Sequence, residues 1–184
     1  MSASPKKKIL AISGSTRKNS TNHYLLQAIA NLTADDFDIV LWEGLADIPP
    51  FNPDADNDGD LPPDPVLAFR LSLRDADGIL ICTPEYAHGV PGSLKNAIDW
   101  TVSSADFSGK PTVLITAATD GKYGHAALLE TLKVIEAKDV EQLQLLIPFA
   151  RTKISPDQRV TDESTQTAIL QLMDNFKRSI LSPA

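Results

Sequence analysis

The sequence predicts an α/β fold, a three-layer sandwich in which a five-stranded parallel sheet of order 2-1-3-4-5 has helices on both faces. Short apolar runs alternate with amphipathic helical patterns along almost the whole chain. Strands that alternate with helices are joined by right-handed crossovers, which build an open, doubly wound sheet. The 184 residues, of which 42% are hydrophobic, fit one domain over residues 1–184.

The first half of the chain alternates strand and helix around one long loop. Strands are expected at Lys8–Ser13, Asp38–Trp42 and Gly78–Thr83, because each is a short apolar run. Helices are expected at Asn22–Leu32, Val66–Asp75 and Gly92–Ser103; apolar residues recur at helical spacing in the first (Leu25, Ala28, Ile29, Leu32) and the third (Leu94, Ala97, Ile98, Val102). Between them, Pro49–Pro65 is rich in Pro, Asp, Asn and Gly, and loops of that length are usually functional or mobile.

The second half continues the alternation. Strands are expected at Thr112–Ala117 and Val140–Ile147, with a helix at Tyr123–Ala137 between them. A closing helix at Asp162–Leu181 is expected to face the core with Ile169, Leu172, Met173, Phe176 and Ile180. In this fold ligands bind beyond the carboxyl ends of the strands, where the winding reverses. The loops Ser13–Asn22, Thr83–Gly92 and Ala118–His125 should therefore converge on one site.

Charge and cysteine content limit the function classes. A net charge of -7 and a pI near 4.9 argue against nucleic acid or an anionic membrane as the main partner. The apolar run behind the basic start MSASPKKK is too short for a signal peptide, and no membrane span follows, so a soluble, cytoplasmic protein is expected. Cys82, the only cysteine, cannot form an internal disulfide and is expected to be a buried, inert thiol.

The loop after the first strand, SGSTRKNSTN, is rich in hydrogen-bond donors. It offers hydroxyl groups, the Arg17 guanidinium and the free amides of a helix N-terminus, which together favour a phosphate. It is neither a P-loop nor a GxGxxG fingerprint. A Ser/Thr/Asn-rich cradle at this switch point is the usual seat of flavin mononucleotide (FMN). The alternative is that Ser20 or Thr21 merely caps the helix and that Arg17 is a surface charge.

The loop after the third strand, TPEYAHGVPGSLKNAIDW, continues into a helix. Pro84 and Pro91 stiffen its backbone while Gly89 and Gly92 free it, so it can present a flat, rigid surface to a ligand.

Together, ISGSTRKNSTN and TPEYAHGVPGSLKNAIDW resemble the NADPH-dependent FMN reductase family, flavodoxin-like flavoenzymes that include chromate, quinone and azo-dye reductases. The resemblance implies that Ser15, Arg17, Ser20 and Asn22, with Thr21 beside them, hold the FMN phosphate. It also implies that the isoalloxazine ring lies along Pro84, Glu85, Tyr86, Ala87 and His88, and that the turn Thr119–Gly121 closes its other side.

Two departures from the family pattern concern the substrate pocket. Many members have Asn where this chain has Ala87, and His88 either replaces that polar function or faces solvent. The third loop is usually a Gly-Gly-rich turn, whereas here TDGKYGHA adds bulk and charge. A substrate pocket that differs from that of better-known members is expected.

The resemblance implies an FMN-dependent oxidoreductase that passes hydride from NADPH or NADH through FMN to a small acceptor such as a quinone, free flavin, chromate or azo compound. The flavin then carries the chemistry, and no catalytic side chain is required. A homodimer or homotetramer that pairs through the LKNAIDW helix is also implied, with Trp100 and the loop Pro49–Pro65 as contacts unless Trp100 belongs to the core.

Two other functions remain open at this stage: a flavodoxin-like electron carrier with a protein partner, and a binding or regulatory protein that lacks the chemistry. Carriers typically enclose the ring between aromatic side chains, and aromatic residues are only 6% of this chain.

No metal site is expected. Asp54, Asp56, Asp58 and Gly59 imitate the start of an EF-hand loop, but Pro65 occupies the twelfth position, where a bidentate Glu is needed. The three histidines, His23, His88 and His125, lack the spacing of a zinc site. A cysteine or serine hydrolase is disfavoured too, because Cys82 lies in an apolar strand and the chain has no GxSxG elbow.

Overall fold

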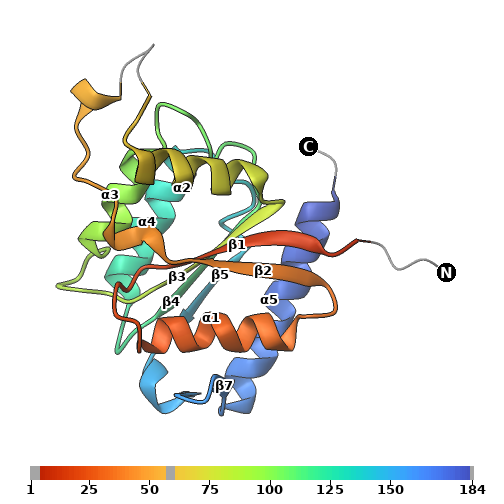
Figure 1. The fold of residues 1–184 in the computed structure, drawn as a ribbon. Coiled ribbons are helices and arrows are strands. Elements are labelled where there is room, and N and C mark those ends of the chain that lie inside the picture. The colour runs from red at the N-terminus through yellow and green to blue at the C-terminus, as the bar shows by residue number, and fades with distance from the viewer. Residues whose placement is uncertain (1–4, 57–60, 183–184) are drawn as a thin grey trace.

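The computed structural model describes residues 5–56 and 61–182 and contains the predicted five-stranded parallel sheet, in the order β2-β1-β3-β4-β5 (Figure 1). The strands are β1 (Lys7–Ser13), β2 (Phe37–Trp42), β3 (Gly78–Thr83), β4 (Thr112–Ala117) and β5 (Gln144–Ile147). The helices are α1 (Thr21–Leu32), α2 (Asp64–Asp75), α3 (Gly92–Asp99), α4 (Lys122–Val134) and α5 (Glu163–Leu181). The predicted fold class and strand order are confirmed.

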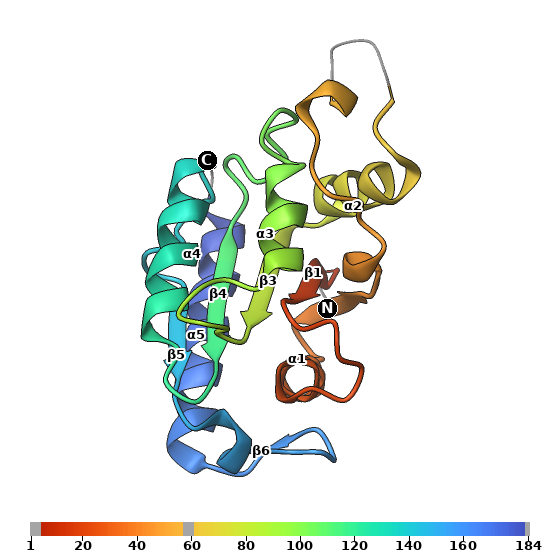
Figure 2. The same ribbon diagram turned by 90° about the vertical axis from the view of Figure 1, so that its left-hand side faces the viewer.

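The sheet is the middle of three layers. Helices α2, α3 and α4 cover one face, and α1 and α5 cover the other (Figures 1 and 2). Successive residues of β1 alternate between them: Leu10 and Ile12 pack with α2 and α3, and Ile9 and Ala11 with α1 and α5. This is why the strands are apolar at nearly every position.

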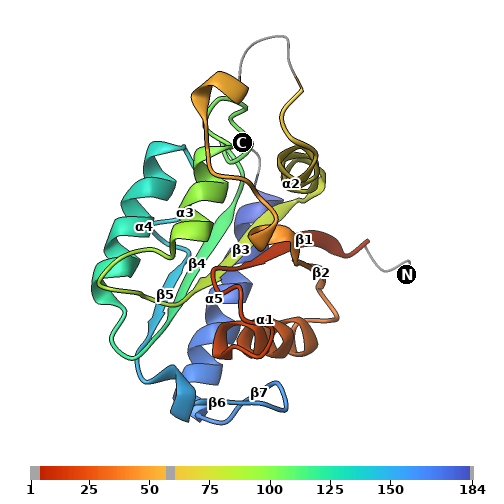
Figure 3. The ribbon, with the colours of Figure 1, turned by 60° about the vertical axis from the view of Figure 1, so that its left-hand side comes forward.

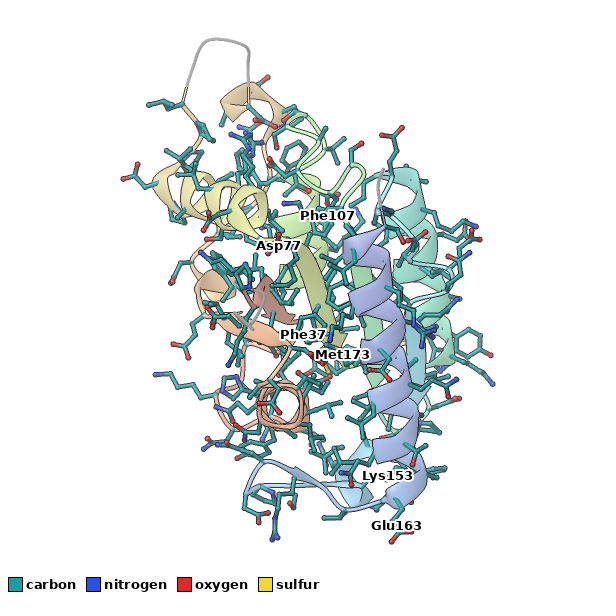
Figure 4. The ribbon with its side chains drawn as sticks, turned by 90° about the vertical axis from the view of Figure 1, so that its right-hand side faces the viewer. Phe37, Asp77, Phe107, Lys153, Glu163 and Met173 are labelled. Carbon is teal, nitrogen blue, oxygen red and sulfur yellow. The ribbon has the colours of Figure 1, made fainter. Side chains whose placement is uncertain are left out.

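Helix α5 packs on the sheet through the apolar face that the sequence predicts. Phe37 and Met173 lie between α5 and the sheet (Figure 4), and the ring centroids of Phe37 and Phe176 are 5.8 Å apart. Gly78 lets Phe176 approach β3, because a Cβ at this position would lie 2.6 Å from the Phe176 ring. The helix is therefore seated against the sheet by aromatic packing.

Several predicted boundaries are wrong. Strand β5 begins only at Gln144, because residues 140–143 form a turn in which the Leu143 N–H donates to Asp139 O at 2.9 Å. Helix α3 ends at Asp99, so Val102 falls in the following turns and is 58% exposed. Helix α4 ends at Val134, three residues early. Leu32 is 38% exposed at the end of α1, whereas Leu25 and Ile29, predicted on the same face, are fully buried.

Five short elements were missed because they have no periodic pattern. They are the 3-10 turns Gly44–Ala46, Pro53–Ala55 and Ala150–Thr152, and the antiparallel strands β6 (Ile154–Ser155) and β7 (Arg159–Val160). The β6–β7 hairpin lies beside α1 (Figures 1 and 3), so the chain after β5 returns toward the start of the first helix. Within residues 5–56 and 61–182, no helix is both long enough and apolar enough to cross a membrane.

The start of the long loop is tied down on α3. Pro49 O accepts hydrogen bonds from Asn96 Nδ2 at 2.9 Å and Trp100 Nε1 at 2.8 Å, and the Phe51 N–H donates to Asn96 Oδ1 at 2.7 Å. The rings of Phe51 and Trp100 meet edge to face at 5.1 Å. Trp100 is 1% exposed, so it is a core residue and the prediction of an intersubunit contact through it is wrong.

Asp56, further along that loop, is held by one ion pair and one hydrogen bond. Asp56 accepts hydrogen bonds from Arg70 at 2.8 Å and from Ser103 at 2.6 Å. Burial alone would raise the pKa of Asp56, but these two bonds hold it below its ordinary value. Asp58 and Gly59, which belong to the EF-hand-like stretch, lie outside the described residues.

Candidate functional site

A cavity of about 390 Å³ lies beyond the carboxyl ends of β1, β3 and β4. The three predicted loops meet there, as the position of the switch point requires. Nine of the predicted site residues line the cavity: Ser15, Arg17, Ser20, Thr21, Asn22, Pro84, Glu85, Tyr86 and Thr119. Its remaining lining residues are Asn19, Ala117, Ala118, Phe149, Ala150, Arg151 and Thr152.

The first loop is folded by its own hydroxyl groups. Ser15 Oγ accepts from the Arg17 N–H at 3.3 Å, and Ser13 Oγ accepts from the Ser15 N–H at 3.2 Å. Ser20 is the N-cap of α1, with its Oγ accepting from the His23 N–H at 3.1 Å. The capping role considered from sequence is thus present at Ser20, and the capped helix end also borders the cavity.

Asn22 joins the first helix to the sheet behind the cavity. It is 4% exposed; its Nδ2 donates to Ala117 O at 3.3 Å, and its Oδ1 accepts from Cys82 Sγ at 3.1 Å. Both ends of the amide are engaged, so the side chain supports the position of α1 over β3 and β4. Burial raises the pKa of the Cys82 thiol, in accord with the inert cysteine predicted.

The second loop contains a strained two-residue turn. Tyr86 and Gly89 exchange backbone hydrogen bonds of 3.1 and 2.9 Å, and between them Ala87 and His88 have φ of 49° and 57°. Two consecutive positive φ values define a type I′ turn, which favours Asn and Gly. An Asn at the position of Ala87 in many family members is thus explained by the backbone as well as by any contact with a ligand.

Ala87 and His88 were predicted beside the ring, but neither lines this cavity. Both residues belong to the tight turn, and the His88 ring lies against the Tyr123 ring of α4, with centroids 4.4 Å apart.

Glu85 fastens the same loop to α4. Its Oε2 accepts from the Gly124 N–H, in the first turn of the helix, at 2.6 Å. A carboxylate at a helix N-terminus is stabilised by the free amides and the helix dipole. Gly124 allows this approach, because a Cβ there would lie 3.0 Å from Gly89 O. The loop of residues 84–89 is therefore fixed in place by contacts within the chain.

The third loop contributes Thr119 to the cavity but not Gly121, which was also predicted. Gly121 has a structural role as the N-cap of α4 with φ of 93°, where a Cβ would lie 2.8 Å from Leu146. His125 is held at both ring nitrogens, 2.8 Å from Thr116 Oγ1 and 2.8 Å from Gln144 Oε1.

Sequence reasoning missed the wall formed by residues 149–152. The Phe149 N–H donates to Thr119 O at 3.1 Å and the Ala150 N–H to Ala118 O at 3.1 Å, so this segment is tied to the third loop. Phe149 has a positive φ of 54° and is 64% exposed. The carboxyl end of β5 lies at the same edge of the sheet as the other strand ends, and this position could have revealed the wall of residues 149–152.

Residues 7–152 match the family model described as NADPH-dependent FMN reductase. The chain belongs to this family. It is 34% identical over 170 residues to an NAD(P)H-dependent FMN reductase of Pseudomonas aeruginosa, covering 89% of this chain and 90% of the relative. It is 30% identical over 176 residues to a 2-hydroxy-1,4-benzoquinone reductase of a Burkholderia species, covering 92% and 93%.

A solved structure gives the same answer for the fold. The flavoenzyme FerB of Paracoccus denitrificans, an NAD(P)H:(acceptor) oxidoreductase, superimposes with a TM-score of 0.74 at 25% identity, covering 95% of this chain and 97% of FerB. FMN reductases of this family use FMN with NAD(P)H as the reductant. The chain is accordingly an FMN-dependent NAD(P)H oxidoreductase with a flavodoxin-like fold.

The cavity has the chemistry that FMN requires. One part is lined by hydroxyl groups, the Arg17 guanidinium and the capped end of α1, which suit a phosphate. Another part is lined by Pro84, Tyr86 and Phe149, which suit a flat ring. The donor set and the apolar surface are thus in one cavity, and the residues present fit the cofactor.

Proposed function

We propose that this chain, as a single FMN-binding domain over residues 1–184, reduces small quinone-type acceptors by two electrons at the expense of NAD(P)H. The observation that carries the proposal is the cavity beside the rigid second loop, where Ala117, Ala118 and Thr119 add only small side chains to a lining that also contains Pro84, Tyr86 and Phe149. Relatives named as quinone reductases support this class of acceptor, among them one of Escherichia coli that is 31% identical over 169 residues.

The proposed roles of the residues follow the two ends of the cavity. Ser15, Arg17, Ser20 and Thr21 would hold the phosphate, with Asn22 fixing α1 behind them. Pro84 and Tyr86 would support the ring, while Glu85 holds their loop on α4. Thr119 would bound the ring from the third loop, and Ala87, His88 and Gly121 would shape the site from outside the cavity.

When bound, FMN supplies the two-electron chemistry, accepting a hydride from NAD(P)H and giving two electrons to the acceptor. The chain contributes binding, orientation and a fixed surface. The loop of residues 84–89 is braced by the Glu85–Gly124 hydrogen bond, the Tyr86–Gly89 pair and the His88–Tyr123 contact. A braced surface keeps its geometry while reductant and acceptor exchange in turn.

The experiment is an anaerobic titration of the FMN-loaded protein. NADPH or NADH is expected to bleach the flavin absorbance within minutes, and one equivalent of a benzoquinone is expected to restore it. Phe149 and Tyr86, two exposed aromatic residues at the cavity, are the feature that would suit a flavodoxin-like electron carrier. If neither nucleotide bleaches the flavin but a protein reductase does, the chain is a carrier.

We also propose a homodimer or homotetramer in the cytoplasm, where NAD(P)H is available. Tyr86, Tyr123 and Val134 are exposed to 54%, 49% and 80%, and they belong to the second loop and α4, on the side of the sheet that carries α3 (Figure 2). Exposed apolar side chains of this size are what an interface would cover.

Light scattering is expected to give a multiple of the 19.9 kDa chain mass. A monomer with full reductase activity would exclude the oligomer, and fractionation of cells would test the location.

A further inference from the structure

Among the arginines of residues 5–56 and 61–182, two differ from the others in that their guanidinium groups have no partner. Arg70 and Arg74 pair with Asp56 and Asp106, Arg159 pairs with Asp157, and Arg178 donates to Asn175. Within residues 5–56 and 61–182, the guanidinium groups of Arg17 and Arg151 make neither an ion pair nor a hydrogen bond. Both line the same cavity, although they are far apart in the sequence.

The fold brings these two arginines to one place. Arg17 lies in the loop that leads into α1, and Arg151 lies in the turn Ala150–Thr152 after β5. That turn precedes the β6–β7 hairpin, which runs beside α1 (Figure 3). Its backbone is fixed by the Ala150 N–H to Ala118 O bond of 3.1 Å and by Thr152 Oγ1 donating to Phe149 O at 2.8 Å.

The lining of the cavity carries more positive than negative charge. Its lining contains one carboxylate, Glu85, which is already hydrogen-bonded to the Gly124 N–H at the start of α4. A phosphate monoester carries a charge of about -1.5 to -2 at neutral pH, so a single arginine leaves part of it uncompensated. Two arginines and the N-terminus of α1 match it more closely.

We propose that Arg151 is a second phosphate-binding residue. It contacts the FMN phosphate from the segment after β5, while Arg17 contacts the phosphate from the first loop. The cofactor then bridges the first loop and the segment after β5, two parts of the chain that no ion pair joins among the described residues. This inference rests on the proposed FMN site and adds to it a residue that neither motif of the sequence contains.

The test measures cofactor affinity directly. Apo-protein is titrated with FMN and with riboflavin, which lacks the phosphate, and flavin fluorescence gives the dissociation constants for the wild type, Arg17→Gln and Arg151→Gln. Each substitution is expected to weaken FMN binding about tenfold or more, because each removes a charge-assisted hydrogen bond, and to change riboflavin binding less than about twofold. Arg151→Lys is expected to recover part of the loss.

Arg159→Gln is the matched control, because its side chain is 76% exposed, already paired with Asp157 and located on the neighbouring hairpin. The melting temperature of each apo-protein reports whether a variant folds. If Arg151→Gln binds FMN like the wild type while Arg17→Gln does not, the inference about Arg151 is wrong and the FMN site stands. A raised KM for NADPH with unchanged FMN affinity would assign Arg151 to the reductant instead. Failure of the wild type to bind FMN would refute the proposed function itself.

Discussion

Replacing Arg70 by Met is expected to lower the free energy of unfolding by about 3 to 5 kcal/mol and the melting temperature by roughly 10 °C, because it leaves the buried Asp56 carboxylate without its partner. The side chains of Arg70 and Asp56 are only 8% and 9% exposed. Arg70 Nε also donates to Trp100 O at 2.8 Å, and Asp106, 1% exposed, lies 4.0 Å from Arg70. Arg70 thus joins Asp56, Trp100 and Asp106 in one buried polar cluster.

The loss comes from the stranded charge as much as from the missing bonds. Because the pKa of Asp56 is depressed in the folded state, its carboxylate contributes stability that is present above its unfolded pKa and lost as the pH falls through the folded value. In Arg70→Met this contribution disappears, and the stability of the variant should depend less on pH in the acid range. Equilibrium unfolding by urea at several pH values measures both effects.

Two further variants separate the effect of the stranded charge from the effect of the missing hydrogen bonds. Asp56→Asn added to Arg70→Met removes one stranded charge and should recover a measurable part of the loss. Arg159→Met is the control for an exposed pair, whose cost is expected below about 1 kcal/mol. Equal losses for Arg70→Met and Arg159→Met would show that the buried network contributes no more than a surface ion pair.

The network also bears on the loop that the sequence could not describe. Pro49–Pro65 appeared irregular because Pro, Asp and Gly carry no periodic pattern, yet residues 49–56 are held by Asn96, Trp100 and Arg70. Each of these contacts joins residues distant in sequence, and a local pattern cannot encode them. The strands and helices were predictable because buried faces impose their spacing on the chain itself.

The same distinction applies to the site. The first two loops were found because their residue types, hydroxyl groups in one and proline with glycine in the other, point to a ligand without knowledge of the fold. Ala87, His88 and Gly121 were assigned to the flavin ring by family resemblance, but none of them lines the cavity, and all three have positive φ values. Phe149 and Arg151 were missed because only the loops after the first, third and fourth strands were expected at the site, although the end of the fifth strand at Ile147 was predicted correctly.

Gly14→Ala is expected to weaken FMN binding more than tenfold and to destabilise the fold by about 1 to 3 kcal/mol, the range for overpacking a filled core. Gly14 directly follows β1, and its N–H donates to Cys82 O at 2.8 Å. A Cβ there would lie 2.3 Å from Thr83 Oγ1 and 3.0 Å from Leu94. Thr83 is 1% exposed and cannot move into open space.

The overlap must displace the chain at the point where the first loop, proposed to bind the FMN phosphate, leaves the sheet, so affinity and stability should fall together. Gly92→Ala is the control, because a Cβ at that helical position meets nothing within 4 Å and alanine is the better helix former. Thr83→Ala removes the nearest atom but leaves its own Cβ 2.8 Å away, so the double variant should recover only part of the loss. Flavin titration and urea unfolding of the wild type and these four variants measure FMN affinity and stability. Wild-type FMN affinity in Gly14→Ala would show that the first loop does not depend on the close approach of Gly14 to Thr83.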